Sequence, residues 1–176
     1  MATTVKRCIG LLAIWFAATA LQAEPSEIPA EMALWRLDCG EILVSDLDQY
    51  SDTYRYQGEQ KTLANSCYLI RHGEKYLLWD TGLAADLAGS SREDGGDRYS
   101  LRRTIIDQLT TIGVRREQIT FVGISHYHFD HTGQAAEFPA ATLLLGMADW
   151  EAVRARADRA ARFDPWIRGG APVQAM

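Results

Sequence analysis

Three of the four histidines in this 176-residue sequence lie within six residues of each other, at 126–131, together with an aspartate. This stretch reads HYHFDH and follows directly after the apolar run ITFVGIS at 119–125. Imidazole and carboxylate groups are ligands for zinc, and also for iron, manganese or cobalt. In a structural zinc site, four protein ligands, usually including cysteines, fill the coordination shell. A cluster with fewer protein ligands leaves coordination positions open for water. The sequence therefore predicts a catalytic metal site, with the ligands His126, His128, Asp130 and His131.

The spacing within the stretch predicts how the ligands are divided. Residues two apart in an extended chain point the same way, so His126 and His128 are expected to converge on one ion, with Asp130 nearby. His131 breaks this alternation and is expected to point elsewhere, which indicates a second ion. A water held between two ions becomes hydroxide near neutral pH. Asp130 is expected to help orient that nucleophile.

The elements that position these residues follow an α/β order. Short strands are predicted by their apolar and β-branched content, at 33–38, 41–45, 63–71, 75–79, 119–124 and 141–146. Helices are predicted at 101–112, with Ser100 as N-cap, and at 148–161. We interpret 46–60 and 89–99 as loops, and find no pattern in the tail after residue 162. Antiparallel strands followed by strand–helix–strand–helix predict a mixed sheet.

The motif resembles the H-x-H-x-D-H signature of the metallo-β-lactamase superfamily. The resemblance extends to NSCYLI at 65–70 and LLWDTG at 77–82, and covers roughly residues 33–155. It implies an αββα sandwich with a metal centre at the sheet edge, of which this chain would supply the N-terminal half. It assigns His126 and His128 to a first zinc ion.

The same resemblance assigns Asp130 and His131 to a second zinc ion and places Asp80 beside the metal centre. An alternative for Asp80 alone is an ordinary turn residue after a strand. The phrases LDCG at 37–40 and SCYLIRHG at 66–73 are similar to the N-acyl-homoserine lactonase branch, as is SHYHFDHTGQ at 125–134. That branch implies hydrolysis of a small-molecule lactone, a quorum-quenching activity. The alternatives are a β-lactamase and an inactive metal-binding fragment.

The superfamily pattern also implies ligands further along the chain that this sequence lacks. No histidine follows His131, and the later aspartates Asp149, Asp158 and Asp164 lie on or beside the last predicted helix. We therefore expect residues 24–176 to be a C-terminally incomplete domain of a longer enzyme. Two zinc ions are expected in the complete enzyme, and one or none in this part of it.

The N-terminus has the three-part layout of a secretory signal peptide at residues 1–23. Lys6 and Arg7 precede an apolar run at 8–21, and cleavage is predicted after Ala20 or Ala23. The run has 14 residues, against about 20 needed to span a bilayer. We therefore expect a periplasmic or secreted protein, with no stable membrane association after cleavage.

The net charge of the chain bears on the class of partner that it can bind. The chain has 18 Lys and Arg against 23 Asp and Glu, a net charge of −5, and no long basic run, which argues against nucleic acid as a partner.

Cys39 and Cys67 remain after cleavage, and we expect two buried thiols, with a disulfide as the alternative. Three tyrosines on the 46–60 loop, at 50, 54 and 56, either form a lip over an acyl chain or pin their own loop. The oligomeric state stays open.

Overall fold

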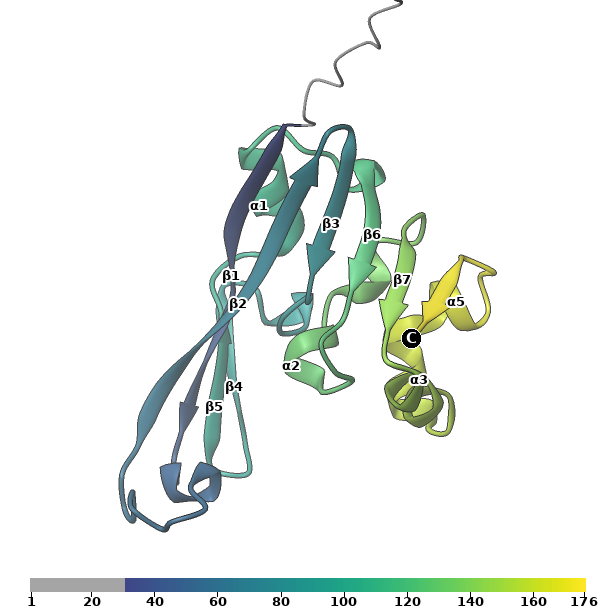
Figure 1. Cartoon of the computed structure of the whole chain (residues 1–176). Coiled ribbons are helices and arrows are strands. Elements are labelled where there is room, and N and C mark those ends of the chain that lie inside the picture. Colours follow the sequence, from purple (N-terminus) through teal and green to yellow (C-terminus); the bar gives the residue numbers. More distant parts are fainter. Residues whose placement is uncertain (1–30) are drawn as a thin grey trace, which may run out of the picture.

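The computed structural model describes residues 31–176, and the predicted signal peptide lies outside these residues (Figure 1). Eight strands form one mixed sheet in the order β4-β5-β1-β2-β3-β6-β7-β8. Their bounds are Met32–Val44 (β1), Lys61–His72 (β2), Lys75–Trp79 (β3), Ser90–Asp94 (β4), Asp97–Leu101 (β5), Ile119–Gly123 (β6), Thr142–Leu145 (β7) and Val173–Ala175 (β8). The pairs from β3 to β8 are parallel and the others are antiparallel. The predicted α/β class with a mixed sheet is confirmed.

The first two predicted strands are one long strand, β1, so the predicted break at residues 39–40 was wrong. The register with β2 shifts between Asp38 and Glu41, and Gly40 has φ +117°. The chain bulges at this point instead of ending the strand, because glycine accepts the positive φ that a bulge can require.

Cys39 and Cys67 form a disulfide, which was the alternative to the two buried thiols that we expected; the burial is confirmed and the unbridged state was wrong. Cys67 pairs with Leu37 across the β1–β2 ladder. Cys39 lies two residues beyond Leu37, and its Cα is 5.7 Å from that of Cys67, within the range that a disulfide spans. Both cysteines are fully buried.

The predicted loop at 89–99 is the hairpin β4–β5. Gly95 and Gly96 form its turn with φ +61° and +91°, as expected for a two-residue hairpin turn. The hairpin lies at the sheet edge and every residue of β4 is exposed, so its sequence lacks the apolar content that identifies buried strands. Ser100 belongs to β5 and is not a helix cap.

Helix α1 spans Ile105–Thr111 and begins later than predicted. Thr104 is its N-cap: its hydroxyl accepts from the backbone N–H of Asp107, whose carboxylate accepts from the backbone N–H of Thr104. This reciprocal pair is a capping box. Ile105 and Leu109 are buried and hold the helix against the sheet.

The C-terminal region contains more structure than its sequence predicts. The helix expected at 148–161 is interrupted at Arg156, where the backbone is extended, and divides into α3 (Met147–Arg154) and α4 (Ala157–Ala160). The tail, for which no element was expected, forms α5 (Asp164–Ile167) and strand β8. Trp166 of α5 is buried and donates from its indole N–H to the carbonyl of Ala141, which fixes the tail on the core.

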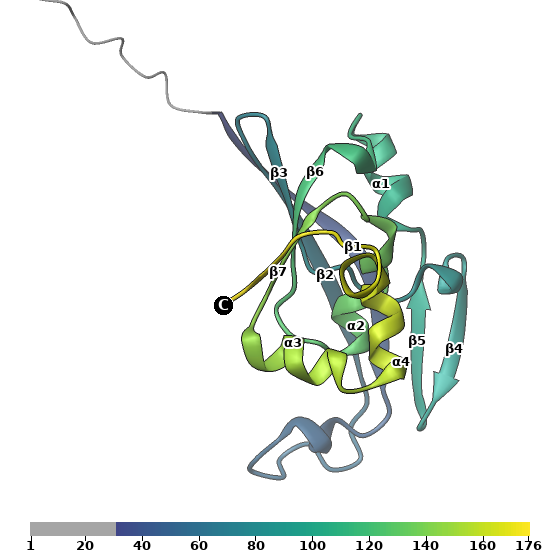
Figure 2. The same cartoon turned by 90° about the vertical axis from the view of Figure 1, so that its right-hand side faces the viewer.

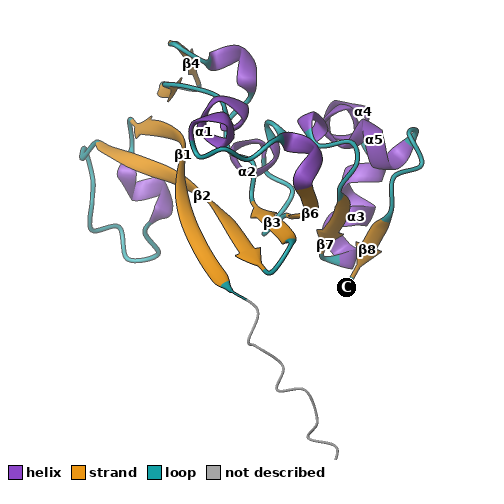
Figure 3. Cartoon of the chain, turned by 90° about the horizontal axis from the view of Figure 1, so that it is seen from above, coloured by secondary structure: helices purple, strands orange, loops and turns teal. Residues whose placement is uncertain are grey.

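The helices lie along one side of the sheet (Figures 2 and 3). The residues that pack beneath them are buried, among them Leu69, Leu78 and Val122. The other face of the sheet is open: Leu34, on that face, is 64% exposed, and Tyr68 and Trp79, which pair across β2 and β3, are 36% and 38% exposed. None of the helices within residues 31–176 has the length and apolar character to cross a membrane.

Candidate active site

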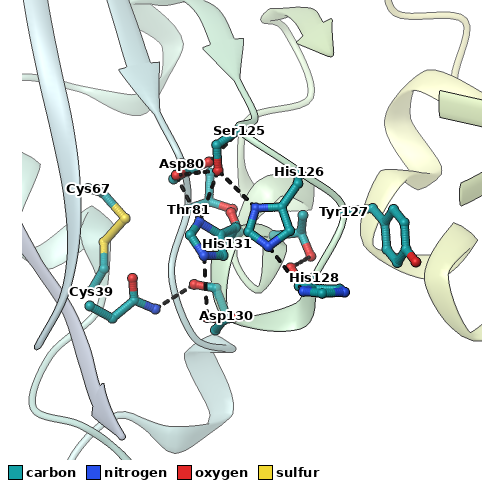
Figure 4. A network of polar contacts seen from close by, with 12 residues as sticks. Cys39, Cys67, Asp80, Thr81, Ser125, His126, Tyr127, His128, Asp130 and His131 are labelled. Carbon is teal, nitrogen blue, oxygen red and sulfur yellow. Dashed lines mark hydrogen bonds and ion pairs between the residues drawn. A yellow bond between two sulfur atoms is a disulfide. The ribbon is translucent and has the colours of Figure 1, made fainter. Parts of the chain in front are cut away.

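The four predicted ligands lie together just after the carboxyl end of β6, an interior strand of the sheet (Figure 4). His126 and His128 lie in an irregular segment, and a short helical turn, α2 (Phe129–Thr132), carries Asp130 and His131. The helical turn replaces the extended chain that strict alternation assumed, and it brings His131 back toward His126. Their ring centroids are 4.2 Å apart, so the expectation that His131 points elsewhere was wrong.

The first pair of candidate ligands is His126 and His128. Nε2 of His126 lies 3.0 Å from Nδ1 of His128, and the two rings meet edge to face. Burial lowers the pKa of His126, and the neighbouring His131 and His128 rings lower it further. This shift favours the neutral imidazole, which is the form that binds metal.

Asp80 is 5% exposed and lies directly after β3, with φ +59°. Its Oδ1 accepts from the backbone N–H of Ser125 at 2.8 Å, and its Oδ2 accepts from the Ser125 hydroxyl at 2.9 Å. Nδ1 of His131 donates to the same Oδ2 at 2.9 Å. Asp80 thus ties the end of β6 to His131 and orients the imidazole so that Nε2 faces outward.

That outward Nε2 of His131 lies 3.3 Å from Oδ2 of Asp130. The hydrogen bonds to Asp130 and then to Asp80 raise the pKa of His131 to about 9, although burial opposes this shift. Burial alone would raise the pKa of Asp130, but the hydrogen bond and charge of His131 bring it below its usual value. In this arrangement His131 carries a proton between two carboxylates, and a cation at Nε2 would take the place of that proton.

The two pairs have the spacing that zinc ligands require. Atoms that bind one tetrahedral zinc ion at about 2.0–2.1 Å lie roughly 3.3 Å apart. The two measured separations, 3.0 Å for His126–His128 and 3.3 Å for Asp130–His131, are close to this value. Among residues 31–176, no three His, Cys, Asp or Glu side chains form one metal-binding group. Each pair thus offers two of the ligands that a zinc ion needs, and neither pair completes a site among the described residues.

Two residues that sequence reasoning gave no role hold the Asp130–His131 turn. The backbone N–H of Thr81 donates to the carbonyl of His131 at 2.7 Å, and the Thr81 hydroxyl donates to the same carbonyl at 3.0 Å. The side-chain amide of Asn65, on β2, donates to the carbonyl of Asp130. Asn65 lies in the motif NSCYLI and Thr81 in the motif LLWDTG, both of which carry the family resemblance. These motifs were the sequence feature that could have identified the two residues.

The later aspartates do not complete the ligand sets. Asp158 pairs with Arg156, and Asp164 pairs with Arg168. Asp149 accepts a hydrogen bond from the backbone N–H of Tyr127.

The tyrosines of the 46–60 loop lie at the end of the long β1–β2 arm (Figure 1). Tyr50, Tyr54 and Tyr56 are all exposed. Burial, followed by the charges of Asp97 and Asp130, raises the pKa of Tyr50.

Comparison with known proteins defines the family. The model of the metallo-beta-lactamase superfamily matches residues 61–169, more than half of the chain. The chain therefore belongs to the metallo-β-lactamase superfamily.

The relatives also confirm the resemblance to the lactonase branch. The N-acyl homoserine lactonase AttM of Rhizobium johnstonii is 30% identical over 115 residues, which cover 61% of this chain and 40% of that protein. An N-acyl homoserine lactonase of Bacillus cereus is 26% identical over 98 residues, 51% of this chain and 39% of that protein. The chain thus spans about 40% of the length of these lactonases.

Solved structures agree on the fold. An N-acyl homoserine lactone hydrolase with N-hexanoyl-L-homoserine bound at its catalytic metal centre superposes with a TM-score of 0.66 at 19% identity, over 85% of this chain and 60% of that chain. The dizinc quorum-quenching lactonase AidC superposes with a TM-score of 0.55 at 19% identity, over 84% and 59%. The expected metallo-β-lactamase-like fold is confirmed.

Proposed function

We propose that the whole protein hydrolyses the lactone ring of N-acyl-homoserine lactones. One observation carries the proposal: the pairs His126–His128 and Asp130–His131 meet at the carboxyl end of β6, each with a spacing that suits zinc ligands, in a chain whose relatives include N-acyl homoserine lactonases. The likeness to a dizinc lactonase supports zinc as the metal. Metals of this kind, when bound, polarise a carbonyl and lower the pKa of water.

The site residues would then have separate roles in metal binding and in hydrolysis. His126 and His128 would hold one ion, and Asp130 and His131 would hold the second. Hydrolysis adds water to the lactone carbonyl carbon, breaks the ring C–O bond and leaves a carboxylate and an alcohol. Asp130 would orient the attacking water through Oδ1, the oxygen not counted as a ligand, and accept its proton there, which then passes to the leaving alkoxide oxygen. Asp80 keeps His131 in one orientation throughout.

Purified whole protein tests this proposal. Elemental analysis is expected to give about two transition-metal ions per chain, and Asp130→Ala is expected to remove most lactone hydrolysis. Asp158→Ala is the matched control, because Asp158 is an exposed residue of α4 whose carboxylate pairs with the neighbouring Arg156. Active wild-type protein without metal, or undiminished turnover by Asp130→Ala, would contradict the proposal.

We also propose that the protein is exported, with the mature chain beginning at Leu21 or Glu24. The buried Cys39–Cys67 disulfide supports this, because structural disulfides persist mainly in oxidising compartments. N-terminal sequencing of periplasmic or secreted material is the test. An intact Met1 on membrane-bound protein would contradict it.

A further inference from the structure

Two residues outside the motif, one on α3 and one on α4, contact the segment that carries His126 and His128. Oδ1 of Asp149, in the first turn of α3, accepts from the backbone N–H of Tyr127 at 3.0 Å. The guanidinium of Arg159, on α4, lies over the Tyr127 ring at 4.1 Å from its centroid, within the range of a cation–π contact. Tyr127 is the residue between the two histidines, so both contacts act at the centre of the pair.

This support matters because the His126–His128 pair lacks the carboxylate that orients His131. Among the described residues, the side-chain hydrogen-bond partners of His126 are Ser125 and His128, and that of His128 is His126. Metal-binding histidines usually depend on a second group to fix the ring. Ser125 is the one side chain outside the pair that hydrogen-bonds either ring among the described residues, so the position of the rings, and of His128 above all, depends strongly on the main chain between them.

The Tyr127 ring connects that main chain to the rest of the fold. It packs against the core cluster and meets the His128 ring edge to face, with centroids 5.0 Å apart. Asp149 fixes the backbone on one side of this ring, and Arg159 covers its face. The segment is thereby anchored to α3 and α4, whereas Asp130 and His131 are anchored to the sheet through Asn65, Asp80 and Thr81.

We propose that Asp149 is a positioning residue for the metal ion held by His126 and His128. This inference rests on the proposed metal-dependent function. Loss of the Tyr127 hydrogen bond is expected to weaken binding of that one ion by about 10- to 100-fold, as found for groups that orient metal ligands. The ion held by Asp130 and His131 is expected to keep its affinity, since its supports come from other elements.

Zinc affinity of the whole protein, measured by competition with a chromophoric chelator, tests this. Wild type is expected to retain two ions, and Asp149→Ala to lose one at chelator concentrations that spare the other. Asp149→Asn keeps an oxygen that can accept from Tyr127 and is expected to retain both. Glu151→Ala, an exposed carboxylate removed from the same helix, is the matched control and is also expected to retain both.

Asp149→Glu separates positioning from helix stability. It keeps a negative charge in the first turn of α3, where the helix dipole favours it, but moves the acceptor by one methylene. We expect an unchanged melting temperature with weakened binding of one ion, and this variant decides the question if Asp149→Ala fails to fold. Two ions bound with wild-type affinity by Asp149→Glu or by folded Asp149→Ala would overturn the inference, as would equal losses for Asp149→Asn and Asp149→Ala. Wild-type protein that binds no zinc would instead contradict the proposed function.

Discussion

Asp80 and His131 are 51 residues apart in the sequence, and their side chains meet at 2.9 Å through Oδ2 and Nδ1. The buried carboxylate also accepts both the backbone N–H and the hydroxyl of Ser125. One aspartate therefore fixes the end of β6 and the orientation of a candidate metal ligand together.

Replacing Asp80 is expected to weaken metal binding without unfolding the protein. In Asp80→Ala, His131 loses the partner that turns Nε2 toward Asp130, so zinc affinity should fall by about 10- to 100-fold. Chelator competition measures this, and Asp86→Ala is the control because Asp86 is an exposed partner of Arg92. Wild-type zinc affinity in Asp80→Ala would show that Asp80 is only a turn residue.

Gly133 lies where the loop after β3 and the loop after α2 interlock. Its N–H donates to the carbonyl of Gly82 at 2.7 Å, and a Cβ at Gly133 would lie 2.3 Å from the backbone nitrogen of Ala84. Gly133→Ala must therefore push the two loops apart. We expect a loss of about 1–3 kcal/mol in the free energy of unfolding, together with weaker zinc binding.

Gly95→Ala is the matched control for this substitution. Gly95 has φ +61° in the β4–β5 turn, and a Cβ there would meet no atom within 4 Å. The change is expected to cost about 1–2 kcal/mol of backbone strain and to leave zinc affinity as in wild type. Unfolding in urea and chelator competition measure the two quantities. Equal effects of the two substitutions on zinc affinity would contradict the account of Gly133.

The disulfide is expected to stabilise the fold and the site together. It encloses a loop with a sequence separation of 28 residues, for which loss of the cross-link typically costs about 2–4 kcal/mol. A Cβ on Gly82 would lie 2.5 Å from Cβ of Cys39, so the disulfide packs directly against the loop that carries Asp80. Urea unfolding of Cys39→Ala/Cys67→Ala measures the loss.

Reduced wild-type protein is the control for the double variant and is expected to lose a similar free energy. If the double variant unfolds at the wild-type urea concentration, the disulfide contributes nothing to stability.

The site residues could be read from the sequence because they are adjacent in it. Imidazole and carboxylate side chains at 126–131 identify metal chemistry before any fold is known. The direction in which the His131 side chain points could not be predicted from the sequence, because a helical turn at 129–132 replaces the extended chain that we expected. The role of Asp149 was also hidden, since its partner is a backbone N–H 22 residues away.

The fold was predictable where strands are buried and regular. β2, β3 and β6 were found close to their observed bounds because their apolar content is high. The exposed strand β4 was missed, since a polar edge strand resembles a loop in sequence. The Cys39–Cys67 bond depends on a bulge in β1 and on strand register, and neither has a clear local signature.

Substrate preference decides between a lactonase and a β-lactamase. It is measured on the zinc-loaded whole protein as the ratio of kcat/KM for an N-acyl-homoserine lactone to kcat/KM for a β-lactam. We expect a clear preference for the lactone. We also expect a metal chelator to abolish hydrolysis of both substrates and added zinc to restore it. A clear preference for the β-lactam would contradict the proposed function and would assign the His126–His128 and Asp130–His131 pairs to a β-lactamase.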